Sequence, residues 1–254
     1  MLILLPPSET KRSGGRGASM RPADWAHPGL LPQRTAVAEA LIALSADAER
    51  AAAVLGLGPR QLDDIPRNAE LGSAPTMPAV DRYTGVLFDA LDAASLPVAA
   101  RRWLGVHVQI HSAPFGPVGA LDPIPAYRLG ASAALPGLAP LKRVWADAVS
   151  TAIAMSAPRF LLDLRSQAYV GLGPVPAEVP SAYVRVVSAG PDGVVRALNH
   201  FNKRTKGELV RDLAQSRPRV RSRGDFLAWA EEAGWDARED VGGEILLVAR
   251  HPTP

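Results

Sequence analysis

Cysteine is absent from this sequence of 254 residues. The chain therefore cannot form disulfides, build a zinc finger or an iron–sulfur cluster, or attack a substrate with a thiolate. Long hydrophobic runs are missing as well: no stretch of about 18 residues, the shortest membrane span, is free of charge and proline. The apolar segment 1–5 stops at two prolines and lacks the positive region of a signal peptide. We expect a cytoplasmic protein without a membrane partner.

The composition is that of a folded protein with a mildly basic surface. Apolar residues make up 47% of the chain, which is ample for a core. The net charge is +3 and the pI about 9.5, and the uneven placement of basic residues favours a local basic face. Residues 6–33 are rich in proline, glycine, serine and arginine without an apolar period, so we expect a loop that is mobile unless a ligand holds it.

Apolar periodicity divides the rest of the chain into alternating strands and helices. Strands are expected at 1–5, 106–111, 159–164, 182–188, 193–198 and 244–250. Helices are expected at 33–44, after a cap at Ser45, at 59–65, 83–91 and 141–155, and from about Thr205 onward. The pattern predicts one domain, 1–254, of the mixed α/β (α+β) class, with a mixed β-sheet flanked by helices.

A glycine-rich turn at 55–60 joins two of the expected helices. Its order, Leu-Gly-Leu-Gly-Pro-Arg, is typical of a helix-hairpin-helix element, here spanning about 45–66. Such an element binds phosphate because glycine lets the backbone approach closely and helix-start amides point outward, which makes Gly56, Gly58 and Arg60 candidate contacts. The alternative is that Gly56 merely ends one helix and Gly58 precedes the next.

A basic segment lies at 196–223, where nine cations face only two acids. Their mutual repulsion favours contact with a polyanion, with Lys203, Lys206 and Arg211 as the first candidates. The alternative is an ordinary solvated surface. Lysines close to other cations can also lose their proton readily, so Lys203 and Lys206 are candidate bases or nucleophiles.

Polar residues follow the expected strand 159–164 at the position where α/β folds place ligand-binding groups. Asp163, a third catalytic candidate, is followed there by Arg165 and Ser166, which are candidate anion contacts. A plain strand-to-helix turn would have the same sequence.

Metal and serine chemistry have little support. His107 and His111 are expected on one face of a strand, where four residues span about 13 Å, too far for one ion. No serine sits in a Gly-x-Ser-x-Gly elbow, and no catalytic triad is recognisable. We expect neither a bound metal nor a cofactor.

An ordered series of short blocks resembles the YaaA-type peroxide stress family. The opening strand with its Ser-Glu-Thr-Lys turn is similar to the family's start, and later blocks are similar to its Tyr-x-Gly, Pro-Tyr-Arg-Leu, Trp-Gly-Asp, Asn-Leu-Ala-Ser-x-Glu-Tyr and Lys-Lys-Ala-Arg-Gly elements. The matching segments here are 1–11, 83–85, 112–116, 122–129, 145–147, 163–169 and 202–207. One departure is Gln167-Ala168, which stands where the family has an acid before the tyrosine.

The resemblance implies an α/β fold with a basic cleft, a helix-hairpin-helix element, binding to duplex or branched DNA, and a role in limiting damage by iron and peroxide. The polar positions carried over to the cleft are Ser8, Lys11, Tyr127, Arg128, Lys203 and Lys206.

Three hypotheses follow. The first is a DNA-binding protein of the oxidative stress response, which contacts the phosphate backbone. The second is an enzyme for a small anionic or nucleotide-like metabolite, such as a diverged biosynthetic paralogue, with a pocket formed by Ser8, Lys11, Arg128, Asp163 and Lys203. The third is a noncatalytic interaction protein.

Overall fold

Strand β1 (Leu2–Leu5) is buried along its whole length near the middle of an eight-stranded sheet. The computed structural model describes residues 1–189, 195–197 and 199–250. The strand order is β4-β3-β1-β6-β7-β10-β9, and β8 pairs with β7. The strands from β3 to β10 along this order run parallel: β3 (Val108–Ser112), β1, β6 (Leu161–Asp163), β7 (Ser181–Ala189) and β10 (Ile245–Val248).

The remaining strands are antiparallel. They are β4 (Gly116–Gly119), β8 (Val195–Ala197) and β9 (Ala237–Glu239) in the large sheet, and β2 (Met77–Pro78) with β5 (Pro123–Ile124) in a separate pair. The continuous apolar sequence of β1 is typical of a parallel strand covered on both faces, which is how it is buried. The fold is therefore the predicted single domain of mixed α/β class.

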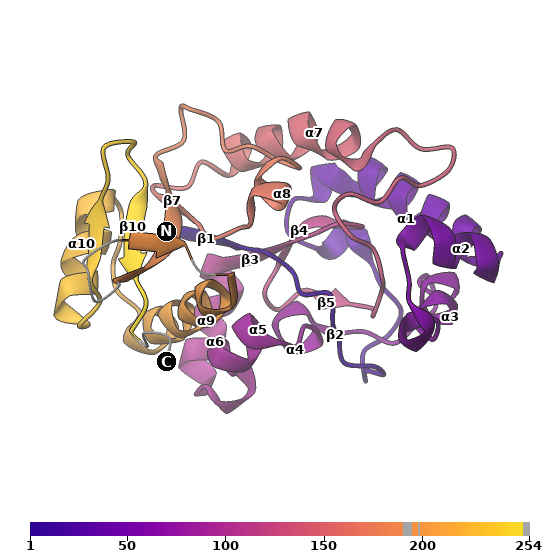
Figure 1. Cartoon of the computed structure of the whole chain (residues 1–254), viewed down its shortest axis with the longest axis horizontal. Coiled ribbons are helices and arrows are strands. Elements are labelled where there is room, and N and C mark those ends of the chain that lie inside the picture. The colour runs from indigo at the N-terminus through magenta and orange to yellow at the C-terminus, as the bar shows by residue number, and fades with distance from the viewer. Residues whose placement is uncertain (190–194, 198, 251–254) are drawn as a thin grey trace.

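Helices cover both sides of the sheet (Figure 1). In this view α7 runs above it, α5, α6 and α9 lie below, α1 to α3 form the right-hand end, and α10 forms the left-hand end. Their bounds are α1 (Leu31–Ser45), α2 (Ala48–Leu55), α3 (Asp64–Ala69), α4 (Ala79–Arg82), α5 (Val86–Leu91), α6 (Val98–His107), α7 (Leu141–Ser156), α8 (Gln167–Val170), α9 (Asn199–Ser216) and α10 (Arg223–Glu232). Short 3₁₀ helices occur at Pro22–Asp24, Pro28–Leu30, Pro59–Gln61 and Ala93–Ser95. In the described part of the chain, no helix has the length and apolarity that a membrane span requires.

Helix α9 packs directly onto α5 because it carries a glycine at the contact. A Cβ at Gly207 would collide with the Leu87 carbonyl oxygen and come within 2.9 Å of the Ala90 Cβ. The close approach of the two helices thus depends on the missing side chain.

Several boundaries differ from the predicted ones. The strand expected at 106–111 begins only at Val108, because α6 continues to His107, whose Nδ1 lies 2.7 Å from the Met1 carbonyl oxygen. His107 and His111 therefore do not share a strand face. Helix α9 begins six residues before Thr205. Positions 193, 194 and 198 of the strand expected at 193–198 lie outside the described residues, and β8 occupies the part between them.

The expected cap at Ser45 was also wrong. Ser45 ends α1 and donates its hydroxyl to the Leu41 carbonyl oxygen at 2.8 Å, while the Asp47 carboxylate accepts from the Arg50 backbone amide and caps α2.

The loop at 6–33 is held by the protein itself, so it needs no ligand to fix it. The buried guanidinium of Arg82 donates to the carbonyl oxygens of Arg12 at 2.6 Å and Gly14 at 2.8 Å. Arg34, equally buried, binds the carbonyl oxygens of Pro22 and Ala26 in the same way. In both cases backbone carbonyl oxygens replace the water that the guanidinium group loses on burial.

Candidate functional site at the carboxyl edge of the parallel strands

Polar side chains converge where β1, β3 and β6 end. Because these strands are parallel, their carboxyl ends meet at one edge of the sheet, the usual place for ligand groups in α/β folds. Lys11 follows β1, Ser112 ends β3, and Asp163 ends β6. The predicted strand is confirmed, with Asp163 as its last residue and Arg165 just beyond its end. Two groups of residues lie at this edge of the sheet.

The first group, the tyrosine cluster, consists of Lys11, Tyr83, Ser112 and Tyr127. The Tyr83 and Tyr127 hydroxyls lie 2.8 Å apart, and both residues are buried. Burial raises the pKa of both phenols, and the nearby Ser112 hydroxyl offsets part of that rise. Both tyrosines therefore stay neutral and form a dry, aromatic wall behind Lys11.

Lys11 is held tightly in front of this wall. It forms a β-bridge with Tyr83, and its ammonium donates to the Ser8 carbonyl oxygen at 2.9 Å and to the Glu9 carbonyl oxygen at 3.3 Å. The ammonium also lies 3.9 Å from the ring centroid of Tyr127. Burial first, and then repulsion by Arg128, lowers the pKa of Lys11 to about 7. Near neutral pH this lysine is thus available both as a cation and as a free amine.

Arg128 and a group of hydroxyls complete this side of the edge. Arg128 forms an ion pair with Glu9 at 3.1 Å, although the Glu9 side chain is 81% exposed. The Thr84 hydroxyl donates to the Thr10 hydroxyl at 2.9 Å, and the Ser8 hydroxyl lies 3.3 Å from the same oxygen. These hydroxyls are exposed at the surface beside Lys11.

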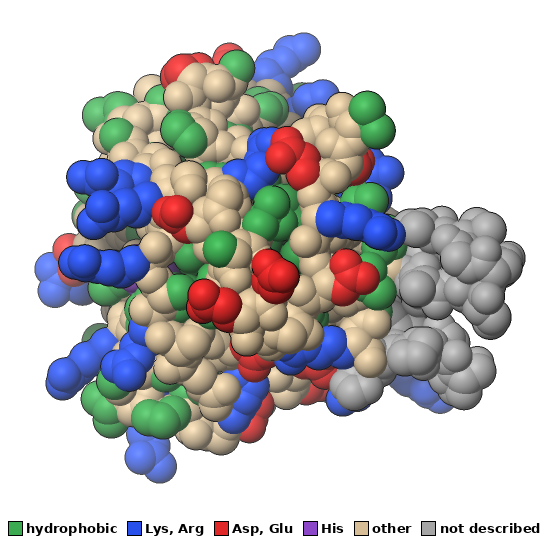
Figure 2. Space-filling view, turned by 90° about the vertical axis from the view of Figure 1, so that its left-hand side faces the viewer, with side chains coloured by type: hydrophobic (Ala, Val, Ile, Leu, Met, Phe, Trp, Pro, Cys, Tyr) green, Lys and Arg blue, Asp and Glu red, His purple; other side chains and the backbone are tan. Residues whose placement is uncertain are grey.

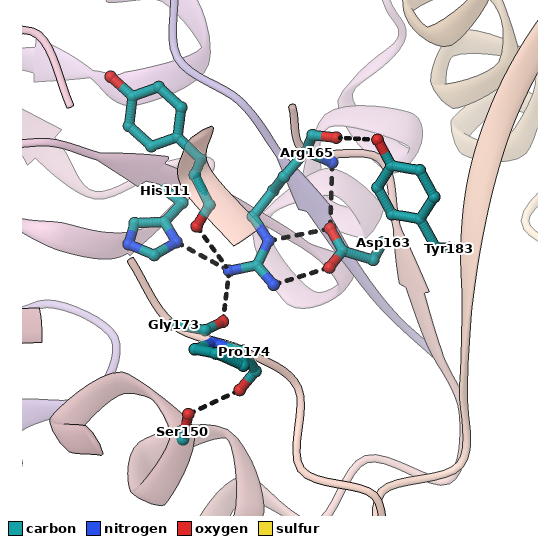
Figure 3. Close-up of polar contacts among 8 residues, drawn as sticks. His111, Ser150, Asp163, Arg165, Gly173, Pro174 and Tyr183 are labelled. Atoms are coloured by element: carbon teal, nitrogen blue, oxygen red, sulfur yellow. Dashed lines mark hydrogen bonds and ion pairs between the residues drawn. The ribbon is translucent and has the colours of Figure 1, made fainter. Parts of the chain in front are cut away.

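The second group, the Arg165 cluster, consists of His111, Asp163, Arg165 and Tyr183 (Figure 3). Arg165 is fully buried and binds the Asp163 carboxylate through two bonds, of 2.9 and 2.7 Å. Its third nitrogen donates to the Gly173 carbonyl oxygen at 2.8 Å, and the Tyr183 hydroxyl donates to the Arg165 carbonyl oxygen at 3.1 Å. Asp163 is therefore neutralised by its partner, which argues against a role as a catalytic base.

His111 completes the Arg165 cluster as a neutral ring. Its Nδ1 lies 2.9 Å from an Arg165 nitrogen, and because a guanidinium can only donate, Nδ1 accepts. Burial and the Arg165 charge lower the pKa of His111 well below its usual value. Its Nε2 then carries the proton, and no described residue accepts it.

Lys206 approaches the Arg165 cluster from α9. It is only 4% exposed, and its ammonium lies 5.6 Å from the Tyr183 ring centroid. Burial lowers the pKa of Lys206 to about 8, although the Asp163 charge opposes the shift. Among the described residues, no hydrogen-bond acceptor or ion-pair partner meets the ammonium. Asn202, four residues earlier on the same helix face, has a buried side-chain oxygen that likewise lacks a partner there.

Tyr169 connects the two groups. Its ring packs edge-on against His111 with centroids 5.8 Å apart. Burial, and then the Glu9 charge, raises the pKa of Tyr169, and Tyr169 in turn contributes to the raised pKa of Tyr83 and of Tyr127. His111 and Ser112 are also adjacent in β3, so the two clusters form one continuous polar edge.

Three further predicted site residues belong to neither cluster. Arg211 donates to the Leu91 and Asp92 carbonyl oxygens, both at 2.9 Å, and so joins α9 to the end of α5 as a structural residue. Lys203 is exposed on α9. Ser166 is exposed just before α8.

The turn at 55–60 has the geometry of the simpler alternative. Gly56, with φ of 63°, ends α2, and Gly58 precedes a 3₁₀ turn in place of a regular second helix. The Gly58 amide donates to the Gln61 side chain at 3.0 Å, and the Leu57 amide donates back into α2. These amides are already paired, so phosphate contact by Gly56, Gly58 and Arg60 stays a prediction.

The basic segment 196–223 is partly neutralised by folding. Arg204 pairs with Glu208 at 2.8 Å, and Arg223 pairs with Glu239 of β9. The end of the molecule that carries α10 and β10 shows acidic side chains interspersed with basic ones (Figure 2). In the part of the chain that the structure describes, no three histidine or acidic side chains gather as metal ligands would.

Sequence reasoning did not select Tyr83, Ser112, Tyr169, Tyr183 or Asn202 as site residues. Ser112 and Tyr183 were detectable in principle, because each lies on a strand beside the predicted edge. The other three depend on long-range packing.

Comparison with known proteins identifies the relatives of this chain. The family described as "Peroxide stress protein YaaA" matches residues 1–240. The chain belongs to this family. The match to the YaaA family includes every residue of both clusters, and it confirms the resemblance seen in the ordered blocks.

Individual relatives extend the match to nearly the full length. A UPF0246 protein of Corynebacterium glutamicum is 41% identical over 255 residues, covering 98% of this chain and 99% of the relative. A UPF0246 protein of Corynebacterium efficiens is 43% identical over 252 residues with the same coverage, and one of Streptomyces coelicolor is 42% identical over 217 residues, or 84% of this chain and 82% of the relative.

Proposed function

We propose that this YaaA-family protein binds a small anionic, nucleotide-like ligand at the carboxyl edge of its parallel strands. The observation that carries the proposal is Lys206, a residue only 4% exposed whose ammonium meets no ion-pair partner among the described residues. Burying a charge without a partner is unfavourable, and none of the described residues supplies that partner, so such a group favours a bound anion. Asp163 acts on Lys206 through its charge, but that charge is already balanced by Arg165, which binds both of its oxygens.

Neighbouring groups specify the ligand further. The unpartnered oxygen of Asn202 accepts a hydrogen bond, which a ligand hydroxyl or amino group would donate. A phosphate on Lys206 and a hydroxyl on Asn202 together match a phosphorylated sugar or nucleotide. The Lys11 amine adds acid–base capacity at the same edge, which makes this ligand a substrate in our proposal.

Thermal unfolding with and without ligand tests this proposal. Pyrophosphate and AMP serve as probes, and each is expected to raise the melting temperature of the native chain. The rise should vanish in Lys206→Met and persist in Lys142→Met, a matched control on the exposed part of α7. Identical ligand-induced rises in both variants, or no rise in the native chain, would reject the proposal.

A second candidate, nucleic-acid binding in the oxidative stress response, is favoured by cations on the surface. Lys203, Arg217, Arg219 and Arg221 are exposed, and their side chains have no ion-pair partner among the described residues. Such groups suit the phosphate backbone of duplex or branched DNA, whose binding weakens with salt through counterion release.

Titrations of duplex and four-way-junction DNA at two salt concentrations test this second candidate. A triple variant with Arg217, Arg219 and Arg221 changed to alanine should bind more weakly and with a smaller salt dependence. The control removes the same charge elsewhere, by changing Arg16, Arg102 and Arg143 to alanine. Equal losses in both triple variants would point to a general charge effect and end this candidate.

A further inference from the structure

The chain uses lysine sparingly. It contains four lysines and 24 arginines, and two of the four, Lys11 and Lys206, lie at the candidate edge. A guanidinium remains charged in proteins, whereas an amine loses its proton once it is desolvated. Lysine at these two positions therefore provides what arginine cannot, a neutral amine near physiological pH.

Lys11 is the amine that a ligand can reach. Lys206 is almost fully buried, whereas Lys11 is only partly so. Two backbone carbonyls, those of Ser8 and Glu9, fix the position of the Lys11 nitrogen, so little side-chain entropy remains to be lost when it reacts. The Tyr127 ring covers one side of this nitrogen, with its centroid 3.9 Å away.

Arg128 lies directly beside this amine. Its guanidinium reaches the Glu9 carbonyl oxygen at 3.5 Å, the same oxygen that Lys11 binds at 3.3 Å, so the two groups are close neighbours. The ion-pair partner of Arg128 is the Glu9 carboxylate, which is mostly in solvent. A substrate carboxylate can therefore replace that of Glu9 without loss of a buried contact.

These groups match one class of substrate. A carboxylate bonded directly to a carbonyl carbon would bring the carboxylate to Arg128 and the carbonyl to Lys11. The hydroxyls of Ser8, Thr10 and Thr84, which are hydrogen-bonded or in contact with one another, can carry protons to and from the carbonyl oxygen.

We propose that the Lys11 nitrogen forms an imine with the carbonyl carbon of a 2-oxo acid whose carboxylate binds Arg128. This inference goes beyond the anion site proposed at Lys206, because it assigns a separate reactive position at the same edge of the sheet and the substrate class that this position takes. The amine lone pair forms the C–N bond as the C=O π electrons move to the oxygen; the nitrogen then gives up one proton and the oxygen takes one up, which gives a carbinolamine. A second proton on that oxygen lets it leave as water with the electrons of the C–O bond, while the nitrogen lone pair forms the C=N double bond of a protonated imine.

Borohydride trapping tests the proposal on the full chain. Pyruvate and 2-oxoglutarate serve as probes, and hydride from borohydride reduces the C=N bond to a stable secondary amine. The expected result is one adduct per chain, located by peptide mapping at Lys11. Lys11→Arg keeps the positive charge and should give no adduct, while Lys142→Arg should be labelled as fully as the native chain.

Peptide mapping of the native chain makes the result independent of how well a variant folds. An unlabelled chain, or equal labelling of Lys11 and Lys142, overturns the imine even where pyrophosphate still raises the melting temperature. An adduct confined to Lys11 supports it even if Lys206→Met leaves the pyrophosphate effect unchanged, a result that would remove only the anion site at Lys206.

Discussion

Replacing Lys206 by methionine should stabilise the protein at neutral pH. Burial lowers the pKa of this lysine from the ordinary 10.5 to about 8. One pKa unit corresponds to about 1.4 kcal/mol, so holding the charge in the folded state costs about 3 kcal/mol at pH 7. Methionine has a similar length and helix propensity, and it loses only the contact with the Tyr183 ring, worth up to about 1 kcal/mol. The net expectation is a gain of about 2 kcal/mol.

The stability gained by Lys206→Met depends on pH. Below pH 8 the lysine is protonated in both the folded and the unfolded chain, and the buried charge destabilises the native protein by the full amount. Between pH 8 and 10.5 the folded state releases the proton while the unfolded state keeps it, so the contribution of Lys206 to native stability improves. The charged and aromatic groups that face the ammonium are Asp163 and Tyr183. The advantage of Lys206→Met should therefore be largest at pH 7 and nearly absent above pH 10.5.

Guanidinium denaturation at several pH values measures both effects. Lys203→Met, on the exposed face of the same helix, is the control and should change the free energy of unfolding by less than about 0.5 kcal/mol. A destabilised Lys206→Met at pH 7 would refute the reasoning, because it would mean that the ammonium has a partner in the folded protein.

Two further changes probe the packing around the site. Arg165→Gln removes the bidentate partner of the buried Asp163 and should lower the free energy of unfolding by about 3–5 kcal/mol. The control, Arg185→Gln, breaks an exposed ion pair on β7 and should lower it by less than about 1 kcal/mol. Equal losses for the two variants in urea denaturation would contradict the importance of the buried pair. Gly207→Ala should separate α9 from α5 and lower the melting temperature by several degrees. The control is Gly224→Ala in α10, where the atom nearest to the added Cβ would be 3.8 Å away, and it should be neutral or slightly stabilising. An unchanged melting temperature in Gly207→Ala would show that the two helices can move apart freely.

Local sequence signals were sufficient for the class of fold and for part of the site. The strand at 159–164 and the polar residues after it were predictable, since an apolar run followed by Asp163 and Arg165 marks a strand end. Lys11 and Arg128 came from the family resemblance, and the structure brings them together. The boundary between α6 and β3 was not predictable, because apolar alternation begins before the helix ends at His107.

The ion pairs that neutralise part of the basic segment 196–223 could not be predicted from the order of charges in the sequence. Within 196–223 the acids are few, and besides Glu208, which pairs with Arg204, carboxylates from other segments pair with its arginines, as Glu239 does for Arg223. Conversely, Asp212 pairs with Arg250, which lies outside that segment. A count of charges along the chain therefore overstates the basic character of the folded surface.

The position of β1 bears on how this protein folds. Ile3 pairs with Val108 on one side and with Leu162 on the other, so neither neighbour is close in sequence. Long loops must close before the centre of the sheet exists, which slows folding in proteins of high contact order. Until then β1 is an unprotected, strongly apolar edge, a template for intermolecular pairing. During refolding from denaturant, aggregation should therefore begin with this strand and rise steeply with protein concentration.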